Sequence, residues 1–279
     1  MKFLVLESET AEEREARRQR AGKSSGETYA ATLTGMVPGA KVTRIAPADA
    51  DAPHMGLEDI AAFDAVFVTG SPLHVYDDKP EVRRQVAFMR AVFASGVRSF
   101  GSCAGLQLAV FAAGGKVRAM TGRIEAAVAR SITATEAGRG HPLLAGRPDA
   151  WDAAAIHTDE VEQLPDGAVL LAGNGVTRVQ AAEIRHDRGV FWGVQYHPEL
   201  APGEIAVAIR HQADSLVESG LATDVEAVER RAALLDRLQH DPADSAARWE
   251  LGVDGEFAEE DGRRRELANF IAAVTRQRG

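Results

Sequence analysis

The chain has 279 residues but a single cysteine, Cys103. One cysteine excludes an intramolecular disulfide and suits a reducing compartment. Long apolar runs are also missing, since none approaches the roughly 18 residues that a membrane-spanning helix needs. The first ten residues, MKFLVLESET, carry too short an apolar run before their acidic residues for a signal peptide or a membrane anchor. These absences predict a cytoplasmic protein that does not bind membranes.

Positive charge is scarce as well: 32 Lys and Arg against 41 Asp and Glu give a formal net charge of −9. Nucleic acid and anionic lipid attract proteins through a positive field, so this balance disfavours both as general partners. Six histidines have no metal-ligand spacing with one another or with the cysteine: His54, His74, His141, His186, His211 and His240. We therefore expect no metal ion and no other cofactor.

Apolar segments alternate with helical segments in the first half of the chain. Strands are predicted at 2–6, 41–46, 65–69 and 97–100, and helical segments at 28–36, 57–63 and 80–94. Residues 7–20 are highly charged, which indicates a solvated helix or a mobile loop. Residues 21–26, AGKSSG, lack the glycine that a phosphate-binding loop needs at position 17, so we expect a flexible connection. The alternation predicts an α/β fold with a doubly wound, mainly parallel sheet flanked by helices.

A second, smaller set of strands, mixed or antiparallel, is predicted from the β-branched segments that follow. These segments are 124–133, 151–157, 169–172, 178–185 and 190–195, and a helix is expected at 203–220. From residue 221 the composition shifts to Ala, Arg, Asp and Glu with helical period. We therefore expect one domain over 1–220 and a helical extension over 221–279. The extension is so polar that we expect it to pack as a peripheral cap.

The stretch from Val97 to Ala113, VRSFGSCAGLQLAVFAA, contains the chain's clearest chemical signal. Gly101 and Gly105 bracket Cys103 as G-x-C-x-G, the cysteine version of the nucleophile elbow. On such a turn the sulfur projects above the sheet, and the N-terminus of the next helix favours its thiolate and offers N–H donors. The alternative is that Cys103 is a buried, inert thiol.

A cysteine nucleophile needs a base and a group that orients the base. His197 and Glu199 follow a predicted strand, and residues i and i+2 of an extended segment lie on the same side. The carboxylate of Glu199 can then hold one imidazole nitrogen while the other faces the thiol. The sequence thus predicts a triad of Cys103, His197 and Glu199.

These motifs resemble the class I (triad) glutamine amidotransferase family, most closely the glutaminase domain of GMP synthase and free-standing proteins like it. The resemblance covers about residues 1–215 and is carried by GSCAGLQ at 101–107, GVQYHPE at 193–199 and AIHTDEV at 155–161. It implies a flavodoxin-like glutaminase fold. It also implies that Cys103 attacks the side-chain amide of glutamine, that His197 moves the proton and that Glu199 orients His197. Water then releases glutamate from a thioester.

The same resemblance implies an oxyanion hole made by the backbone N–H groups of Ala104 and Ser71. The family usually has Gly-Gly-Pro where this chain has Gly70-Ser71-Pro72, so a turn that needs positive φ would be strained at Ser71. Gly70 and Gln107 match substrate-contacting positions, although Gln107 can also be an ordinary helix residue. His157 and Asp159 border the same pocket in the family, but they fit a structural pair equally well.

Several functions stay open at this point. Family glutaminases pass ammonia to a synthetase, and too few residues follow the glutaminase portion to form one. The acceptor would then lie on a separate synthetase subunit, or the protein is a stand-alone hydrolase of a γ-glutamyl compound. A cysteine hydrolase of the related chaperone/peptidase group is disfavoured, because those proteins commonly carry histidine where this chain has Ala104. A non-catalytic regulatory protein that keeps the fold is the remaining alternative.

Overall fold

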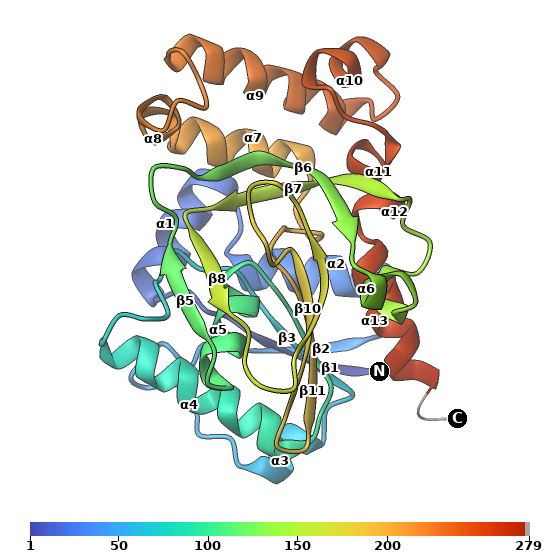
Figure 1. Cartoon of the computed structure of the whole chain (residues 1–279). Coiled ribbons are helices and arrows are strands. Elements are labelled where there is room, and N and C mark those ends of the chain that lie inside the picture. The colour runs from blue at the N-terminus through green and yellow to red at the C-terminus, as the bar shows by residue number, and fades with distance from the viewer. Residues whose placement is uncertain (277–279) are drawn as a thin grey trace.

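A nine-stranded sheet forms the centre of the computed structural model, which describes residues 1–276 (Figure 1). Its strands are β1 (Lys2–Leu6), β2 (Lys41–Ile45), β3 (Ala65–Val68), β4 (Ser99–Ser102), β6 (Glu125–Ala134), β7 (Ala150–His157), β9 (Val169–Gly173), β10 (Ala181–His186) and β11 (Gly189–Val194). Two further strands, β5 (Lys116–Ala119) and β8 (Asp159–Gln163), form a separate antiparallel pair. The sequence did not predict β5 or β8.

The strand order is β2-β1-β3-β4-β11-β10-β9-β6-β7. The first five strands of this order are parallel to their neighbours, and the remaining pairings are antiparallel. The predicted α/β fold with a doubly wound, mainly parallel portion flanked by helices is therefore confirmed. The later strands form the expected mixed set: β11 is parallel to β4, and the antiparallel pairings beyond it continue the same sheet. As a result, β11 lies directly beside β4, and the segments that follow these two strands meet.

The helices are α1 (Ala11–Ala21), α2 (Ser25–Met36), α3 (Leu57–Ala61), α4 (Pro80–Ser95), α5 (Ala104–Ala112), α6 (Glu136–Arg139), the 3₁₀ turn η1 (Pro142–Leu144), α7 (Pro202–His211), α8 (Ala213–Glu218), α9 (Val225–His240), α10 (Ser245–Leu251), α11 (Gly255–Ala258), α12 (Glu260–Arg263) and α13 (Arg265–Arg276). The charged segment at 7–20 thus contains a helix. The flexible connection expected at 21–26 is wrong, because buried Ser24 caps α2 in a capping box with Glu27. The single helix expected at 203–220 is divided into α7 and α8.

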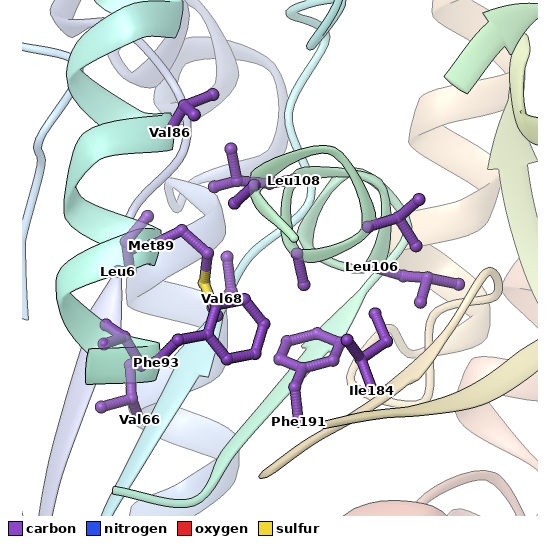
Figure 2. Close-up of a cluster of buried hydrophobic side chains, with 14 of the residues drawn as sticks. Leu6, Val66, Val68, Val86, Met89, Phe93, Leu106, Leu108, Ile184 and Phe191 are labelled. Atoms are coloured by element: carbon purple, nitrogen blue, oxygen red, sulfur yellow. The ribbon is translucent and has the colours of Figure 1, made fainter. Parts of the chain in front are cut away.

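Side chains of the parallel strands alternate between two buried layers, as the two-residue period of a strand requires. On one face, Leu6, Val66 and Val68 pack against α4 and α5. Figure 2 shows this cluster, in which Met89 and Phe93 of α4 meet Val68 of β3 and the leucines of α5. The cluster holds α5, and with it the residue that precedes α5, firmly on the sheet.

The other face of the sheet carries a second cluster in which the last helix takes part. Phe3 and Phe67 lie here with Tyr29 of α2 and with Phe270 of α13. Phe270 makes edge-to-face contacts with Phe67, at 5.4 Å between ring centroids, and with Trp192, at 5.8 Å. The expectation of a purely peripheral extension is therefore wrong for α13, which completes the core on this face.

A third cluster joins α7 and α9 to one side of β6 and β7 (Figure 1). Ile205 and Ile209 of α7 pack against Leu235 and Leu238 of α9, and Ala154 of β7 closes the cluster from the sheet side. This part of the extension forms an outer layer, as expected. The domain boundary at residue 220 stays a prediction. No helix among residues 1–276 is long and apolar enough to cross a membrane.

Candidate active site

Cys103 occupies the sharp turn between β4 and α5 and has φ 52° and ψ −114°. Its N–H donates to the carbonyl oxygen of Val194 at the end of the neighbouring strand, at 2.9 Å. The flanking glycines are required by space: a Cβ on Gly101 would lie 2.9 Å from the ring of Phe191, and one on Gly105 would lie 2.5 Å from the carbonyl oxygen of Val68. The turn therefore has the geometry that the G-x-C-x-G pattern predicts.

His197 and Glu199 lie just beyond β11, next to Cys103. Nδ1 of His197 is 2.7 Å from Oε1 of Glu199, and the His197 backbone N–H donates to the carbonyl of Ala154 at 2.7 Å. Burial by itself lowers the pKa of His197, but the Glu199 carboxylate and the Cys103 sulfur outweigh it and raise the pKa to about 10. Both neighbours of the imidazole therefore favour its protonated form.

Gly70 and Ser71 follow β3, the strand on the other side of β4. A Cβ on Gly70 would lie 2.9 Å from Cε1 of His197 and 3.7 Å from Cβ of Cys103, so glycine lets this turn approach both side chains. Within residues 1–276, the non-glycine residues with positive φ are Cys103, Ala127, Ser131 and Asp187, and Ser71 is not one of them. The departure from Gly-Gly-Pro therefore brings no left-handed strain. Ala104 opens α5 and is buried next to Cys103.

Gln107, His157 and Asp159 line the same cavity as Cys103. The amide nitrogen of Gln107 donates to the backbone oxygen of Asp159 at 3.0 Å and to the side chain of Gln195 at 3.2 Å. Both ring nitrogens of His157 are occupied, one by Glu125 and the other by the backbone oxygen of Asp159, each at 2.9 Å. These contacts favour the structural alternative for His157.

The Asp159 carboxylate is engaged from the opposite side. It accepts from Tyr76 at 3.1 Å and lies 2.6 Å from Nδ1 of His74, whose ring stacks on Tyr76. His74 also lines the cavity, although its spacing in the sequence indicated nothing. Its partner Asp159 is the first residue of β8, a strand that the sequence did not predict.

A chain of buried hydroxyl groups lies behind the carboxylate of Glu199. Ser102 Oγ donates to Glu199 Oε1 at 3.0 Å and is 2.6 Å from the hydroxyl of Tyr29. Because the only proton of Ser102 goes to Glu199, Tyr29 is the donor to Ser102. Burial and the Glu199 charge raise the pKa of Tyr29 well above its ordinary value, so the phenol keeps its proton. The sequence analysis assigned no role to either residue: Ser102 lies within the 101–107 motif, directly before Cys103, and Tyr29 belongs to α2, far from the triad motifs in the chain.

The cavity around Cys103 has a volume of about 600 Å³. One part of its lining comes from the turns after β3, β4 and β11. The opposite wall is formed by α1, with Glu13, Ala16 and Arg17, and by α7. The position of Glu7, Ser8 and Glu9 directly after β1 could have indicated this wall, because ligands of open α/β sheets bind at the carboxyl ends of strands.

The chain belongs to the class I glutamine amidotransferase family, whose model matches residues 34–212. It is 37% identical over 235 residues, 83% of this chain and 79% of the relative, to a γ-glutamyl-L-1-hydroxyisopropylamide hydrolase from a Pseudomonas species. It is 36% identical over 104 residues to a glutamine-hydrolyzing GMP synthase subunit from Methanocaldococcus jannaschii, and the match covers 37% of this chain and 52% of that relative.

Solved structures of the family share the fold over nearly the whole chain. A glutamine amidotransferase from Thermotoga maritima has a TM-score of 0.65 at 13% identity and covers 98% of this chain and 97% of its own. A glutamine amidotransferase from Methylobacillus flagellatus has a TM-score of 0.62 at 20% identity, with 98% and 94% covered. The resemblance inferred from the motifs is therefore confirmed at the level of the family.

Proposed function

We propose that this protein hydrolyses the γ-amide bond of a γ-glutamyl amide through a thioester on Cys103. The observation that carries the proposal is the position of Cys103, on an elbow at the bottom of a cavity, beside the buried His197–Glu199 pair. The triad provides a nucleophile, a proton carrier and a group that fixes the tautomer of the carrier.

The reaction follows from these groups. The Cys103 thiolate attacks the amide carbon, and the backbone N–H groups of Ser71 and Ala104 hold the oxyanion. The C–N bond breaks as His197 gives its proton to the leaving nitrogen, which departs as ammonia or an amine. Neutral His197 then takes a proton from water, the hydroxide attacks the thioester, and glutamate leaves with regeneration of the thiolate and the imidazolium. Glu199 keeps the imidazole oriented in both steps.

Gly70, Gln107, His157 and Asp159 are proposed to shape the part of the cavity that receives the glutamyl group. Gln107 and His157 support this role through their backbone and side-chain bonds, which fix the pocket wall around residues 157–159. No cofactor enters the proposed reaction.

A stand-alone hydrolase is favoured over an ammonia-delivering glutaminase by the similarity to the hydrolase from Pseudomonas, which extends over 83% of the chain. The second candidate is a glutaminase that supplies ammonia to a separate synthetase. It is favoured by the similarity to the GMP synthase protein from Methanocaldococcus jannaschii, which covers a smaller part of the chain. The two candidates share the chemistry at Cys103 and differ in the leaving group.

The test is glutamate release from glutamine and from a panel of γ-glutamyl amides, with wild type and with Cys103→Ala. We expect release by wild type and none above background by the variant, while the circular dichroism spectrum is unchanged. A glutamine-like electrophile should label wild type once per chain, because Cys103 is the only thiol, and excess substrate should protect it. Equal release by Cys103→Ala would refute the proposal, and no release by either protein would favour a non-catalytic role.

A further inference from the structure

The cavity around Cys103 extends to a wall formed by α1 and α7. The hydrolysis of a side-chain amide by the triad does not itself need this wall. On this side its lining includes Ala16 and Arg17 of α1, Leu200, and Glu204, Val207 and Ala208 of α7, with Glu13 and Arg20 of α1 and His211 of α7 beside them. We call the first six of these residues the α1–α7 chamber. Helix α1 lies outside residues 34–212, the segment that matches the family model. The chamber is therefore partly built by a segment beyond the matched family core.

The chemistry of the triad decides which part of a substrate points into this chamber. His197 must give its proton to the leaving nitrogen, so the leaving group lies on the His197 side of the sulfur. The chain runs from His197 through Glu199 and Leu200 directly into α7. On this ground the leaving group is assigned to the α1–α7 chamber, and the glutamyl group to the side of Gln107 and Asp159.

Helix α1 is fixed in place over the chamber. Arg17 reaches Glu204 of α7 at 3.5 Å, and the same carboxylate oxygen accepts from Thr28 of α2 at 2.9 Å. The other oxygen of Glu204 accepts from the backbone N–H of Ala201 at 3.1 Å. At the other end of the helix, Arg14 forms a two-pronged ion pair with Asp49. These contacts make the wall a preformed part of the cavity.

The lining of the chamber matches a small amphiphilic group. Ala16, Leu200, Val207 and Ala208 are aliphatic, and the Arg17–Glu204 pair adds polar atoms at one side. Ammonia needs neither the aliphatic lining nor the space. The whole cavity, which includes the part proposed for the glutamyl group, has about 600 Å³, within the range of about 300–1,000 Å³ that is usual for small-molecule sites.

We propose that the α1–α7 chamber binds the N-substituent of a secondary γ-glutamyl amide, a short alkyl group with or without a polar end. This rests on the proposed function and deepens it, because it assigns the residues that select the amine. The C–N bond breaks, the nitrogen takes the proton of His197, and a neutral primary amine is released into the chamber. The chamber residues select the substrate and take no part in bond making.

The first test compares kcat/KM of wild type for glutamine and for its N-methyl, N-ethyl and N-propyl amides. A methylene in an apolar pocket changes kcat/KM by about 10–200-fold, so we expect the best N-alkyl amide to exceed glutamine by at least tenfold. Glutamine as the best substrate would overturn the chamber proposal and leave the hydrolase standing. Hydrolysis of none of these compounds would overturn both proposals.

The second test changes the size of the chamber by one substitution on α1 and one on α7. Ala16→Leu fills it, and the ratio of kcat/KM for the N-propyl amide to that for glutamine should fall at least tenfold. Val207→Ala enlarges it without a clash and should shift the optimum to a longer alkyl group. Ala11→Leu is the matched control, since Ala11 is on the same helix but exposed and outside the lining. The ratio should not change in the control.

Labelling of Cys103 by an electrophile reports whether each variant keeps a folded site. If Ala16→Leu and Val207→Ala are both labelled at the wild-type rate and both keep the wild-type ratio, the chamber does not bind the substituent. If Ala16→Leu is not labelled, Val207→Ala alone decides, because a smaller side chain leaves α1 in place.

Discussion

Two buried histidine–carboxylate pairs lie within the same molecule and differ in what surrounds them. His157 is held by Glu125 at 2.9 Å and by a backbone oxygen on its other nitrogen, and Glu125 also accepts from Asn174 and Gln180. His197 is held by Glu199 at 2.7 Å, and the other side of its ring faces Cys103. In the first pair, both ring nitrogens are occupied by hydrogen-bond partners within the chain. In the second pair, the side of the ring away from Glu199 faces the sulfur of Cys103, which lines the cavity.

The two pairs also differ in their pKa shifts. Burial would raise the pKa of Glu125, but its bonds to His157, Asn174 and Gln180 outweigh burial and lower that pKa. At the second pair, the pKa of His197 rises to about 10. A buried His–Glu pair therefore indicates catalysis only when one ring nitrogen is left for another reactive group.

The largest expected difference between the pairs is in the two histidines themselves. His197→Gln should lower kcat on the order of 10⁴–10⁶-fold, the range for loss of a triad histidine. His157→Gln should retain far more turnover and instead cost about 1–3 kcal/mol of stability, because buried partners lose their hydrogen bonds. Steady-state kinetics and urea unfolding of both variants measure this. Equal loss of turnover in the two variants would show that the comparison is wrong.

Ser71→Pro tests oxyanion binding separately from the proton transfer that we assign to His197. Proline removes the N–H that we assign to the oxyanion hole, and loss of one donor costs about 10²–10³ in kcat. Ser71→Ala keeps the N–H and is the matched control. Both variants are compared by kcat, by KM and by circular dichroism. A second donor located elsewhere would leave Ser71→Pro as active as the control.

The carboxylates give a matched pair of isosteric changes. Glu199→Gln keeps the size of the side chain but can select the wrong imidazole tautomer. Because a cysteine thiolate depends less on its base than a serine does, we expect kcat to fall on the order of 10–10³-fold. Glu125→Gln should act mainly on stability. Rapid-quench measurement of thioester formation and hydrolysis should find both steps slowed in Glu199→Gln. Wild-type rates in both steps would remove Glu199 from the triad.

The raised pKa of His197 predicts how stability depends on pH. Because the folded state binds the proton more tightly than the unfolded state does, this contribution is complete below the ordinary histidine pKa of about 6.5. It is lost as the pH rises through the folded-state value of about 10. The stability difference between wild type and His197→Gln should therefore shrink from pH 6 to pH 10, measured by urea unfolding. The difference between wild type and His157→Gln serves as the reference.

Tyr29→Phe should have the smallest effect. It removes the hydroxyl that donates to Ser102, which in turn donates to Glu199. One hydrogen bond is worth about 0.5–1.5 kcal/mol, so we expect kcat to fall about 2–10-fold with KM unchanged. A change confined to stability would show that this hydroxyl chain supports the fold and does not orient Glu199.

The parts of the site that the sequence predicted are those formed by residues close together in short sequence motifs. The elbow around Cys103 and the His197–Glu199 pair depend on residues one or two positions apart, so the local backbone brings them into place. The meeting of the two motifs follows from parallel strands that end at the same edge of a sheet. The occupied nitrogens of His157 could not be predicted, because Glu125 comes from a strand 32 positions away in the chain.

The error at α13 has a different cause. The mean composition of residues 221–279 is polar, and the prediction of a peripheral cap used that mean. The apolar residues of α13 nevertheless follow the spacing of one helix face, with Leu267, Phe270, Ile271 and Val274. Glu266 is fully buried in the same helix and binds Arg147 through both oxygens, at 2.6 and 2.7 Å. A charged residue in such a helix is thus an internal partner, which composition cannot distinguish from a solvated one.

The backbone at Cys103 has a consequence for the history of this site. With φ at 52°, the residue has a conformation that side chains disfavour by about 1–3 kcal/mol and that glycine adopts freely. Replacing an ordinary residue by glycine usually destabilises a protein, yet here Cys103→Gly should be more stable than Cys103→Ala. Selection for stability alone would therefore drive this position toward glycine. A cysteine here therefore costs stability, the trade-off expected at a position that serves as the proposed nucleophile.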